Sequence, residues 1–296
     1  MIARYPDVEK PLYSVEAPLA SIEDGKNDLR TRNASGDDWE RHNVIERTGG
    51  SVHVYCELMD VQHGNLGGRA GGDDLASLMV FRFRFDSQKQ SRRVLRARVK
   101  VELFPEVAGG KLPELEAIAP DERWSLMPTK DHQEATAGTE LSLGSSQVVE
   151  ASGKVNWSKV TSKDVSAATT VAGAKNLASN SDKGAYTRAT WTFLENETRS
   201  SGVPDSVRVA MLVRRDTDEP FRAEVAVEVD TDMATKIGSY FKKVPVDDPV
   251  LFNPKAQGKL KKGRTQGVLN LGDVDLYSLC DARMSAKAFW ATHATE

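Results

Sequence analysis

Residues 79–104 read MVFRFRFDSQKQSRRVLRARVKVELF, and apolar and basic side chains alternate through both halves of this stretch. Side chains on a β-strand point to opposite faces in turn, whereas a helix would scatter the same basic residues around its circumference. The stretch therefore predicts two strands joined by the polar turn DSQKQS. The predicted inward side chains are Met79, Phe81, Phe83, Phe85, Leu95, Ala97, Val99, Val101 and Leu103. The predicted outward basic side chains are Arg82, Arg84, Arg96, Arg98 and Lys100.

The same two-residue period returns around residues 52–58, 185–194, 207–213 and 221–230, and turns rich in Gly, Pro and Asp separate these segments. Short alternating strands at such spacing are typical of antiparallel sandwiches and barrels. No strand–helix–strand rhythm appears, which argues against a doubly wound α/β fold. We therefore expect an all-β protein, an antiparallel, jelly-roll-like β-sandwich of about eight to ten strands.

Composition outside the strands suggests how the chain is divided. Residues 1–48 are polar and are expected to form a loosely ordered lead-in. Residues 49–255 are expected to form the sandwich, with a polar Ser/Thr/Gly-rich excursion at 137–184. Residues 256–296 are expected to form a tail that packs on the sandwich. Its apolar residues at loosely helical spacing predict one short helix: Leu276, Leu279, Met284 and Ala288.

The totals exclude several classes of protein. The 296 residues carry a formal net charge of −3, so no overall field favours nucleic acid or an anionic membrane. Cys56 and Cys280 are the only cysteines, too few for a disulfide framework or a zinc site. The first residues lack the apolar run of a secretory leader, so we expect no such leader. The sequence also has no apolar run of about 18 residues and no phosphate-binding or dinucleotide-binding motif. We therefore expect a cytoplasmic protein without cofactor or metal.

The purpose of the arginines is the central question. Residues 79–104 contain eight basic and two acidic residues. In a hairpin, Arg82 would lie opposite Arg96, or Arg84 opposite Arg92, and like charges that face each other across a ladder are destabilising. The acidic residues of 221–230 could compensate if their strand lay alongside, and the arginines would then be the solvated side of a sheet.

The alternative is a binding site for an anionic partner, made by Arg82, Arg84, Arg96, Arg98 and Lys100. Nucleic acid is the less favoured partner, because no aromatic residues are interleaved among these arginines to stack on bases.

No catalytic constellation emerges from the motifs. His53 and Cys56, for example, are three residues apart on a predicted strand and so face opposite sides. We expect a non-enzymatic binding or interaction protein that acts through a protein partner or through self-association. One alternative is an enzyme or ligand-cavity protein whose site is assembled from distant strands. Another is a membrane-active, pore-forming-like protein that refolds residues 137–184.

Five stretches together resemble an uncharacterised family of proteins from filamentous fungi: RRVLRARVKVELF, DERWSLMPT, WTFLENETRSSGVPDSVRVAMLVRR, EPFRAEVAVEV and DDPVLFNP. The resemblance covers about residues 75–255 and rests on the spacing of aromatic, Arg and Pro positions. It implies a cytosolic, mostly β protein and no particular activity.

Overall fold

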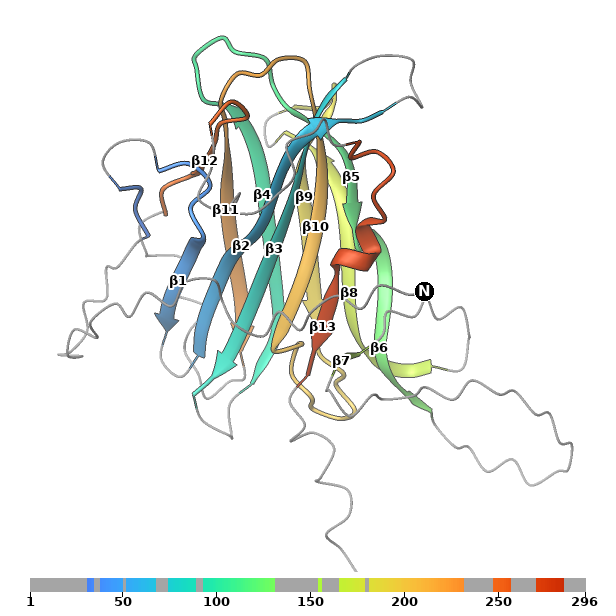
Figure 1. Ribbon diagram of the computed structural model, residues 1–296. Helices are drawn as coiled ribbons and strands as arrows, with labels where there is room; N and C mark the ends of the chain where they lie inside the picture. Colours follow the sequence, from blue (N-terminus) through green and yellow to red (C-terminus); the bar gives the residue numbers. More distant parts are fainter. Residues whose placement is uncertain are drawn as a thin grey trace, which may run out of the picture.

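Two antiparallel β-sheets pack face to face in the computed structural model of the chain (Figure 1), which confirms the predicted β-sandwich. The structure describes residues 31–34, 38–49, 52–67, 74–88, 93–130, 154–155, 165–178, 181–231, 247–256 and 270–284. Among these residues, no helix is long and apolar enough to cross a membrane.

The first sheet, sheet B, has seven strands within the described residues, in the order β1-β2-β3-β10-β13-β7, with β5 also paired to β10. They are β1 (Asn43–Gly49), β2 (Val52–Asn65), β3 (Leu75–Ser87), β5 (Glu114–Ala119), β7 (Lys154–Val155), β10 (Ser206–Arg215) and β13 (Asp281–Arg283).

The second sheet, sheet A, has six strands within the same ranges, in the order β12-β11-β4-β9-β8-β6. They are β4 (Val94–Pro105), β6 (Glu122–Lys130), β8 (Val165–Leu177), β9 (Tyr186–Leu194), β11 (Phe221–Thr231) and β12 (Val250–Phe252).

The two strands of residues 79–104 do not form a hairpin. β3 pairs with β2 and β10 in sheet B, whereas β4 pairs with β9 and β11 in sheet A. The hypothesis that Arg82 faces Arg96, or Arg84 faces Arg92, across one ladder is therefore wrong. The chain crosses from one sheet to the other between the strands, so both apolar sets still point into the same core. The periodicity is satisfied equally well by a hairpin and by a crossover.

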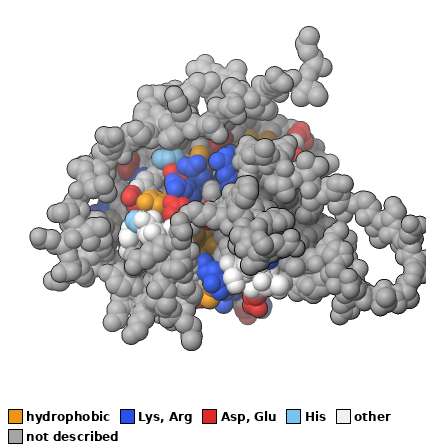
Figure 2. Space-filling view, turned by 90° about the horizontal axis from the view of Figure 1, so that it is seen from below, with side chains coloured by type: hydrophobic (Ala, Val, Ile, Leu, Met, Phe, Trp, Pro, Cys, Tyr) orange, Lys and Arg blue, Asp and Glu red, His pale blue; other side chains and the backbone are white. Residues whose placement is uncertain are grey.

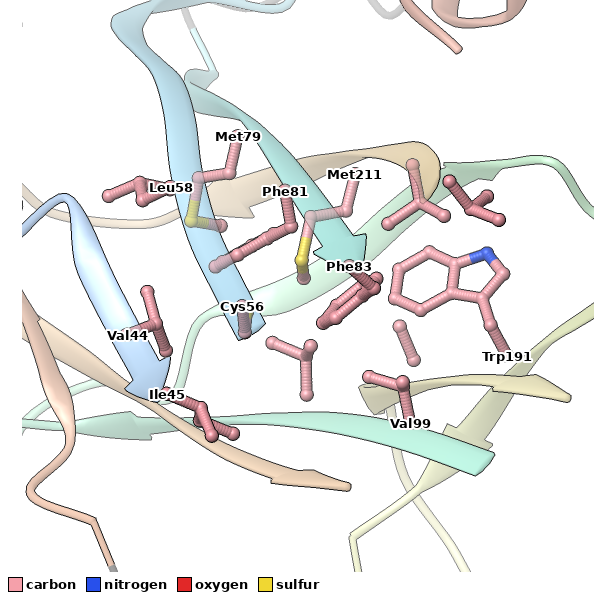
Figure 3. Close-up of a cluster of buried hydrophobic side chains, with 14 of the residues drawn as sticks. Val44, Ile45, Cys56, Leu58, Met79, Phe81, Phe83, Val99, Trp191 and Met211 are labelled. Atoms are coloured by element: carbon pink, nitrogen blue, oxygen red, sulfur yellow. The ribbon is translucent and has the colours of Figure 1, made fainter. Parts of the chain in front are cut away.

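The core fills the space between the sheets. Phe81, Phe83, Val99, Trp191 and Met211 have no exposed surface, and Figure 3 shows them meeting from β3, β4, β9 and β10. The alternating burial along β3 and β4 is what the sequence period predicts. Removal of such surface from water is worth about 25 cal/mol per Å² and is the main driving force for folding.

A smaller apolar cluster covers part of the outer face of sheet B. Residues 270–284 include a short 3₁₀ helix, Leu276–Leu279, which agrees with the short helix predicted for the tail. Leu271, Leu276 and Cys280 pack there against side chains of β3 and β10 such as Leu78 and Leu212. The rest of the outer face of sheet B is left for polar residues.

Two boundaries differ from those expected. β1 begins at Asn43, inside the predicted lead-in, because Val44 and Ile45 are buried against the core. Residues 165–177 of the predicted excursion form β8, which lies between β6 and β9. β8 was missed because its side chains are small: Val171 and Gly173 face Phe193 and Trp191 across the ladder. Residues 137–153 and 156–164 lie outside the described residues.

Trp191 offers a direct test of this core. It is fully buried, and its Nε1 donates to the carbonyl of Pro120 at 3.0 Å. We expect Trp191→Ala to lower the free energy of unfolding by about 3–5 kcal/mol, through lost packing and the cavity left behind. Tyr186→Ala, at an exposed position of the same strand, should change it by no more than about 1 kcal/mol. Equal effects of the two changes, measured by urea unfolding, would contradict this description of the interior.

Candidate anion-binding surface

The structure separates the five predicted site residues. Arg82 and Arg84 lie on the outer face of sheet B, whereas Arg96, Arg98 and Lys100 lie on the outer face of sheet A. The two groups are on opposite sides of the sandwich because β3 and β4 belong to different sheets. The arginines therefore make two surfaces, and each has its own neighbours.

On sheet A, the basic strand lies beside an acidic one. Arg98 of β4 is opposite Glu228 of β11, and Arg96 is opposite Asp230. Lys100 Nζ lies 2.7 Å from Glu228 Oε1, and Arg96 Nε lies 3.5 Å from Asp230 Oδ2. The hydrogen bond from Lys100 lowers the pKa of Glu228. The interpretation of these residues as a solvated ladder of ion pairs is confirmed for Arg96 and Lys100.

On sheet B, four strands carry two rows of outward side chains. One row runs Glu57, Arg82, Arg208 and Asp281 across β2, β3, β10 and β13. The arginines of this row are neighbours, and each also contacts a carboxylate: Arg82 Nε is 2.6 Å from Glu57 Oε2, and Arg208 pairs with Asp281. Like charges at the centre of the row are thus offset by acids at its two ends.

The next row runs Tyr55, Arg84, Ser206 and Arg283 across the same strands. The Arg84 guanidinium lies 5.2 Å from the centre of the Tyr55 ring, and it also contacts Asp86 at 2.6 Å. The Tyr55 ring stacks on His53 with a centroid distance of 6.0 Å. A stacked guanidinium has less conformational freedom to lose when it binds an anion.

Ser206 lies between two arginines in this row. Arg84 of β3 and Arg283 of β13 are directly opposite it on either side, at positions whose Cβ atoms are about 5 Å apart in antiparallel pairs. Arg283 is exposed, and among the described residues no carboxylate forms an ion pair with it. We call Arg84, Ser206 and Arg283, with the adjacent Arg82 and Arg208, the Ser206 cluster.

Charges of both signs appear on the surface of the sandwich that is seen from below. Figure 2 shows the sandwich from below, with Lys and Arg side chains grouped near the centre of the coloured surface and acidic and His side chains beside them. The surface seen from below is therefore mixed in charge.

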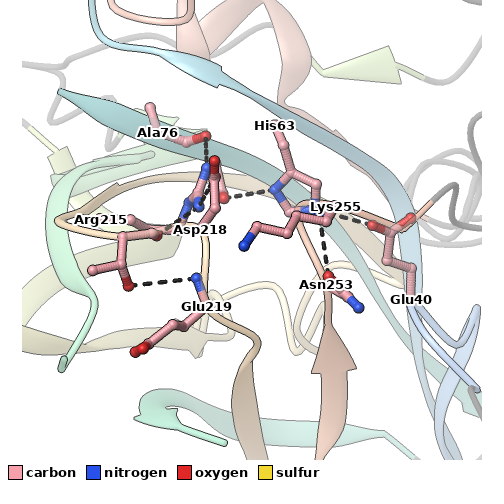
Figure 4. A network of polar contacts seen from close by, with 10 residues as sticks. Glu40, His63, Ala76, Arg215, Asp218, Glu219, Asn253 and Lys255 are labelled. Carbon is pink, nitrogen blue, oxygen red and sulfur yellow. Dashed lines mark hydrogen bonds and ion pairs between the residues drawn. The ribbon is translucent and has the colours of Figure 1, made fainter. Parts of the chain in front are cut away.

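A second polar cluster is buried between the sheets at the other end of β3. His63 Nδ1 lies 2.7 Å from Ser77 Oγ, and His63 Nε2 lies 3.0 Å from Glu40 Oε1. Nearby, Arg215 donates to the Ala76 carbonyl at 3.1 Å and to Asp218 Oδ1 at 2.9 Å. Figure 4 shows His63 between Glu40 and this Arg215 group.

A histidine that contacts a serine hydroxyl on one side and a carboxylate on the other is the arrangement of an acyl-transfer triad. A catalytic nucleophile, however, must be able to reach its substrate. Ser77 and Glu40 have no exposed surface. A depression beside Arg215 and Phe221 has a cavity volume of about 10 Å³, enough for about one water molecule. We assign this cluster a structural role. Its hydrogen bonds connect Glu40 to β2 and β3, and the Glu40 backbone N–H also donates to the carbonyl of Leu251 in β12.

Other reactive groups are shielded as well. Cys56 and Cys280 are buried free thiols, and burial raises the pKa of Cys56 well above its usual value and that of Cys280 to about 12. A thiol that stays protonated is a poor nucleophile. Within the described residues, no three His, Cys, Asp or Glu side chains are grouped closely enough to hold a metal ion.

Neither a protein-family model nor a curated protein matches the chain. The resemblance to a family of filamentous fungi therefore stays a prediction.

Sequence reasoning missed Tyr55, Ser206, Arg208 and Arg283 as neighbours of Arg82 and Arg84. The two-residue period of residues 52–58 and 207–213 is enough to put Tyr55 and Arg208 on an outward face, but no signal in the sequence shows which strands lie side by side. β13 has only three residues, too few to display a period.

Glu57 gives this surface a measurable pH dependence. Burial acts to raise the pKa of Glu57, but its contacts with His42 and Arg82 outweigh burial and lower the pKa to about 2. A carboxyl with a lowered folded-state pKa stabilises the fold above its unfolded value of 4.5, and that stabilisation is lost as pH falls from 4.5 toward 2. The loss is at most about 3 kcal/mol.

We therefore expect the difference in unfolding free energy between wild type and Glu57→Gln to shrink as pH falls from 5 to 2. Urea titrations at several pH values provide the measurement, and Glu46→Gln, at an exposed position of β1, is the matched control. If the difference in unfolding free energy between wild type and Glu57→Gln does not vary with pH, then Arg82 and His42 do not lower the pKa of this carboxyl.

Proposed function

We propose that the protein is a non-enzymatic interaction protein that binds a partner carrying a compact oxyanion, a phosphate or a sulfate, through the Ser206 cluster. The observation that carries the proposal is Arg283, an exposed guanidinium with no ion pair to a described carboxylate, beside a serine whose other neighbour is Arg84.

The chemistry of the cluster suits a tetrahedral anion. Arginine presents several N–H donors in a planar fork that matches phosphate and sulfate oxygens, and a hydroxyl supplies one further donor. Arg84 and Arg283 flank Ser206 on adjacent strands, so their side chains can converge on an anion above the hydroxyl. Arg82 and Arg208, in the next row, add positive charge about two residues away along each strand.

The opposite face of the sandwich supports this choice by contrast. Arg98 also has no ion pair within the described residues. It is, however, directly opposite Glu228, and Asp230, on the same strand as Glu228, is its diagonal neighbour. An anion there would meet the carboxylates of β11 and be repelled. Arg98 is therefore a matched control for Arg283.

A binding role is favoured over catalysis because the one triad-like arrangement in the described chain is sealed inside the core. An interaction protein requires only a stable scaffold and an exposed set of donors, and the residues of β2, β3 and β10 in both rows lie in continuously paired parts of their strands. The cytoplasmic location and the oligomeric state stay predictions.

The test titrates inorganic phosphate, and separately inorganic sulfate, into isotope-labelled protein at low ionic strength. We expect saturable shifts of the amide signals of Arg84, Ser206 and Arg283, with millimolar affinity that weakens as salt rises. Arg283→Gln should weaken binding at least about tenfold, the loss typical of one charge-assisted contact.

Arg98→Gln removes the same charge from the opposite face and should leave binding and shifts unchanged. Thermal unfolding of both variants checks that the fold is intact, since both side chains are exposed. Absence of saturable shifts in wild type, or equal losses in the two variants, would refute the proposal.

A further inference from the structure

Within the described residues, strand β11 has a partner strand along only part of one edge. Along its inner side it pairs with β4 from Phe221 to Thr231. Along its outer side, the described residues of β12 pair with Phe221, Arg222 and Ala223. In the part of the chain that the structure describes, no strand pairs with residues 224–230 on this side. In antiparallel sheets, backbone groups alternate between the two neighbours, so about half of those in residues 224–230 point away from the sheet.

The inward side chains in the middle of this edge are less buried than those on either side of them along the same strand. Val225 and Val227 point inward but are only partly buried, whereas Ala223 and Val229 on the same side of the strand are buried. Among the described residues, the apolar layer is thus incompletely covered along residues 224–230, where β11 has no described neighbour on this side. An added strand with apolar residues on its inner side would complete it.

The outward side chains of the same residues are acidic. Glu224, Glu228 and Asp230 project from the outer face, and their side chains are 49%, 52% and 59% exposed. Glu228 and Asp230 already contact Lys100 and Arg96 through one oxygen each. A carboxylate has two acceptor oxygens, so each retains capacity for a second cation from the open side.

These acids also bear on self-association. If two copies paired this edge with itself in antiparallel fashion about Val227, Glu224 of one copy would lie opposite Asp230 of the other. Like charges directly opposite are destabilising, and charged residues on edge strands are a known means of preventing such pairing. The acidic side chains therefore disfavour pairing of this edge with the same edge of a second copy, and they suit a strand that carries positive charge.

We propose that the open edge of β11, residues 224–230, binds an extended segment of a partner protein in which apolar residues alternate with Lys or Arg. The segment adds a strand to sheet A, its apolar residues cover Val225 and Val227, and its basic residues pair with Glu224, Glu228 and Asp230. This surface and this partner are distinct from the Ser206 cluster and do not depend on it.

The test uses a synthetic seven-residue peptide of alternating lysine and valine, and a peptide of alternating glutamate and valine as its charge-reversed control. Hydrogen exchange of the amides of residues 224–230, followed by NMR with the full chain, reports strand addition. We expect the amides that do not face β4 to exchange quickly in the free protein and to be protected by the lysine peptide only.

Glu228→Lys should weaken binding of the lysine peptide at least tenfold, and the milder Glu228→Gln should weaken it by a smaller factor. Glu197→Lys makes the same charge change in an exposed turn away from the edge and should have no effect.

Three results would overturn the proposal. One is protection of every amide of residues 224–230 in the free protein at all concentrations, because another segment of the chain would then occupy the edge. A second is protection that rises with protein concentration, because a second copy would then be the occupant. The third is equal binding of the two peptides.

Discussion

Burial of the inward-pointing side chains of two sheets against each other is the constraint on which the rest of the structure depends. Phe81 and Phe83 from sheet B meet Val99 and Trp191 from sheet A with no exposed surface on any of them. Because side chains alternate along a strand, burial of one set forces the other set outward. The charged surfaces are therefore a direct consequence of the core, and each outward arginine is held in place by the apolar residues on either side of it.

Outward charges are then sorted by which strands become neighbours. On sheet A, β11 brings carboxylates to Arg96 and Lys100, and the surface is largely balanced. On sheet B, Arg82 and Arg208 are adjacent, and their carboxylates come from strands further out. Arg283 lies beside Ser206 in the second row without such a carboxylate among the described residues. The same arginine-rich stretch thus contributes to two surfaces with different binding properties.

The sequence was a good guide to everything that depends on local alternation. The strand positions of residues 79–104, the inward direction of Phe81 or Val99, and the all-β class follow from a two-residue period. The same period could not distinguish a hairpin from a crossover, because both place the apolar residues in one core. It also failed for β8, where small residues such as Gly173 pack closely: a Cβ at Gly173 would lie 2.0 Å from the carbonyl oxygen of Pro120.

The candidate site was predictable only in part, for a related reason. Arg82 and Arg84 were identified from their alternation, but Arg96, Arg98 and Lys100 belong to the opposite face. Ser206 and Arg283 come from strands more than a hundred residues away along the chain, and only the pairing of β3, β10 and β13 brings them beside Arg84. Long-range pairing is decided by the fit of whole sheets, which no single segment encodes.

The central claim is that β3 and β4 lie in opposite sheets, with the arginines of one stretch on opposite sides of the molecule. The most direct measurement is the distance between spin labels at Arg84→Cys and Arg98→Cys, which is feasible because native Cys56 and Cys280 are buried. The sheets of a sandwich pack about 10 Å apart, and both labels point outward, so the account predicts a separation above about 20 Å. A separation near 10 Å or less would place both arginines on one face and contradict it.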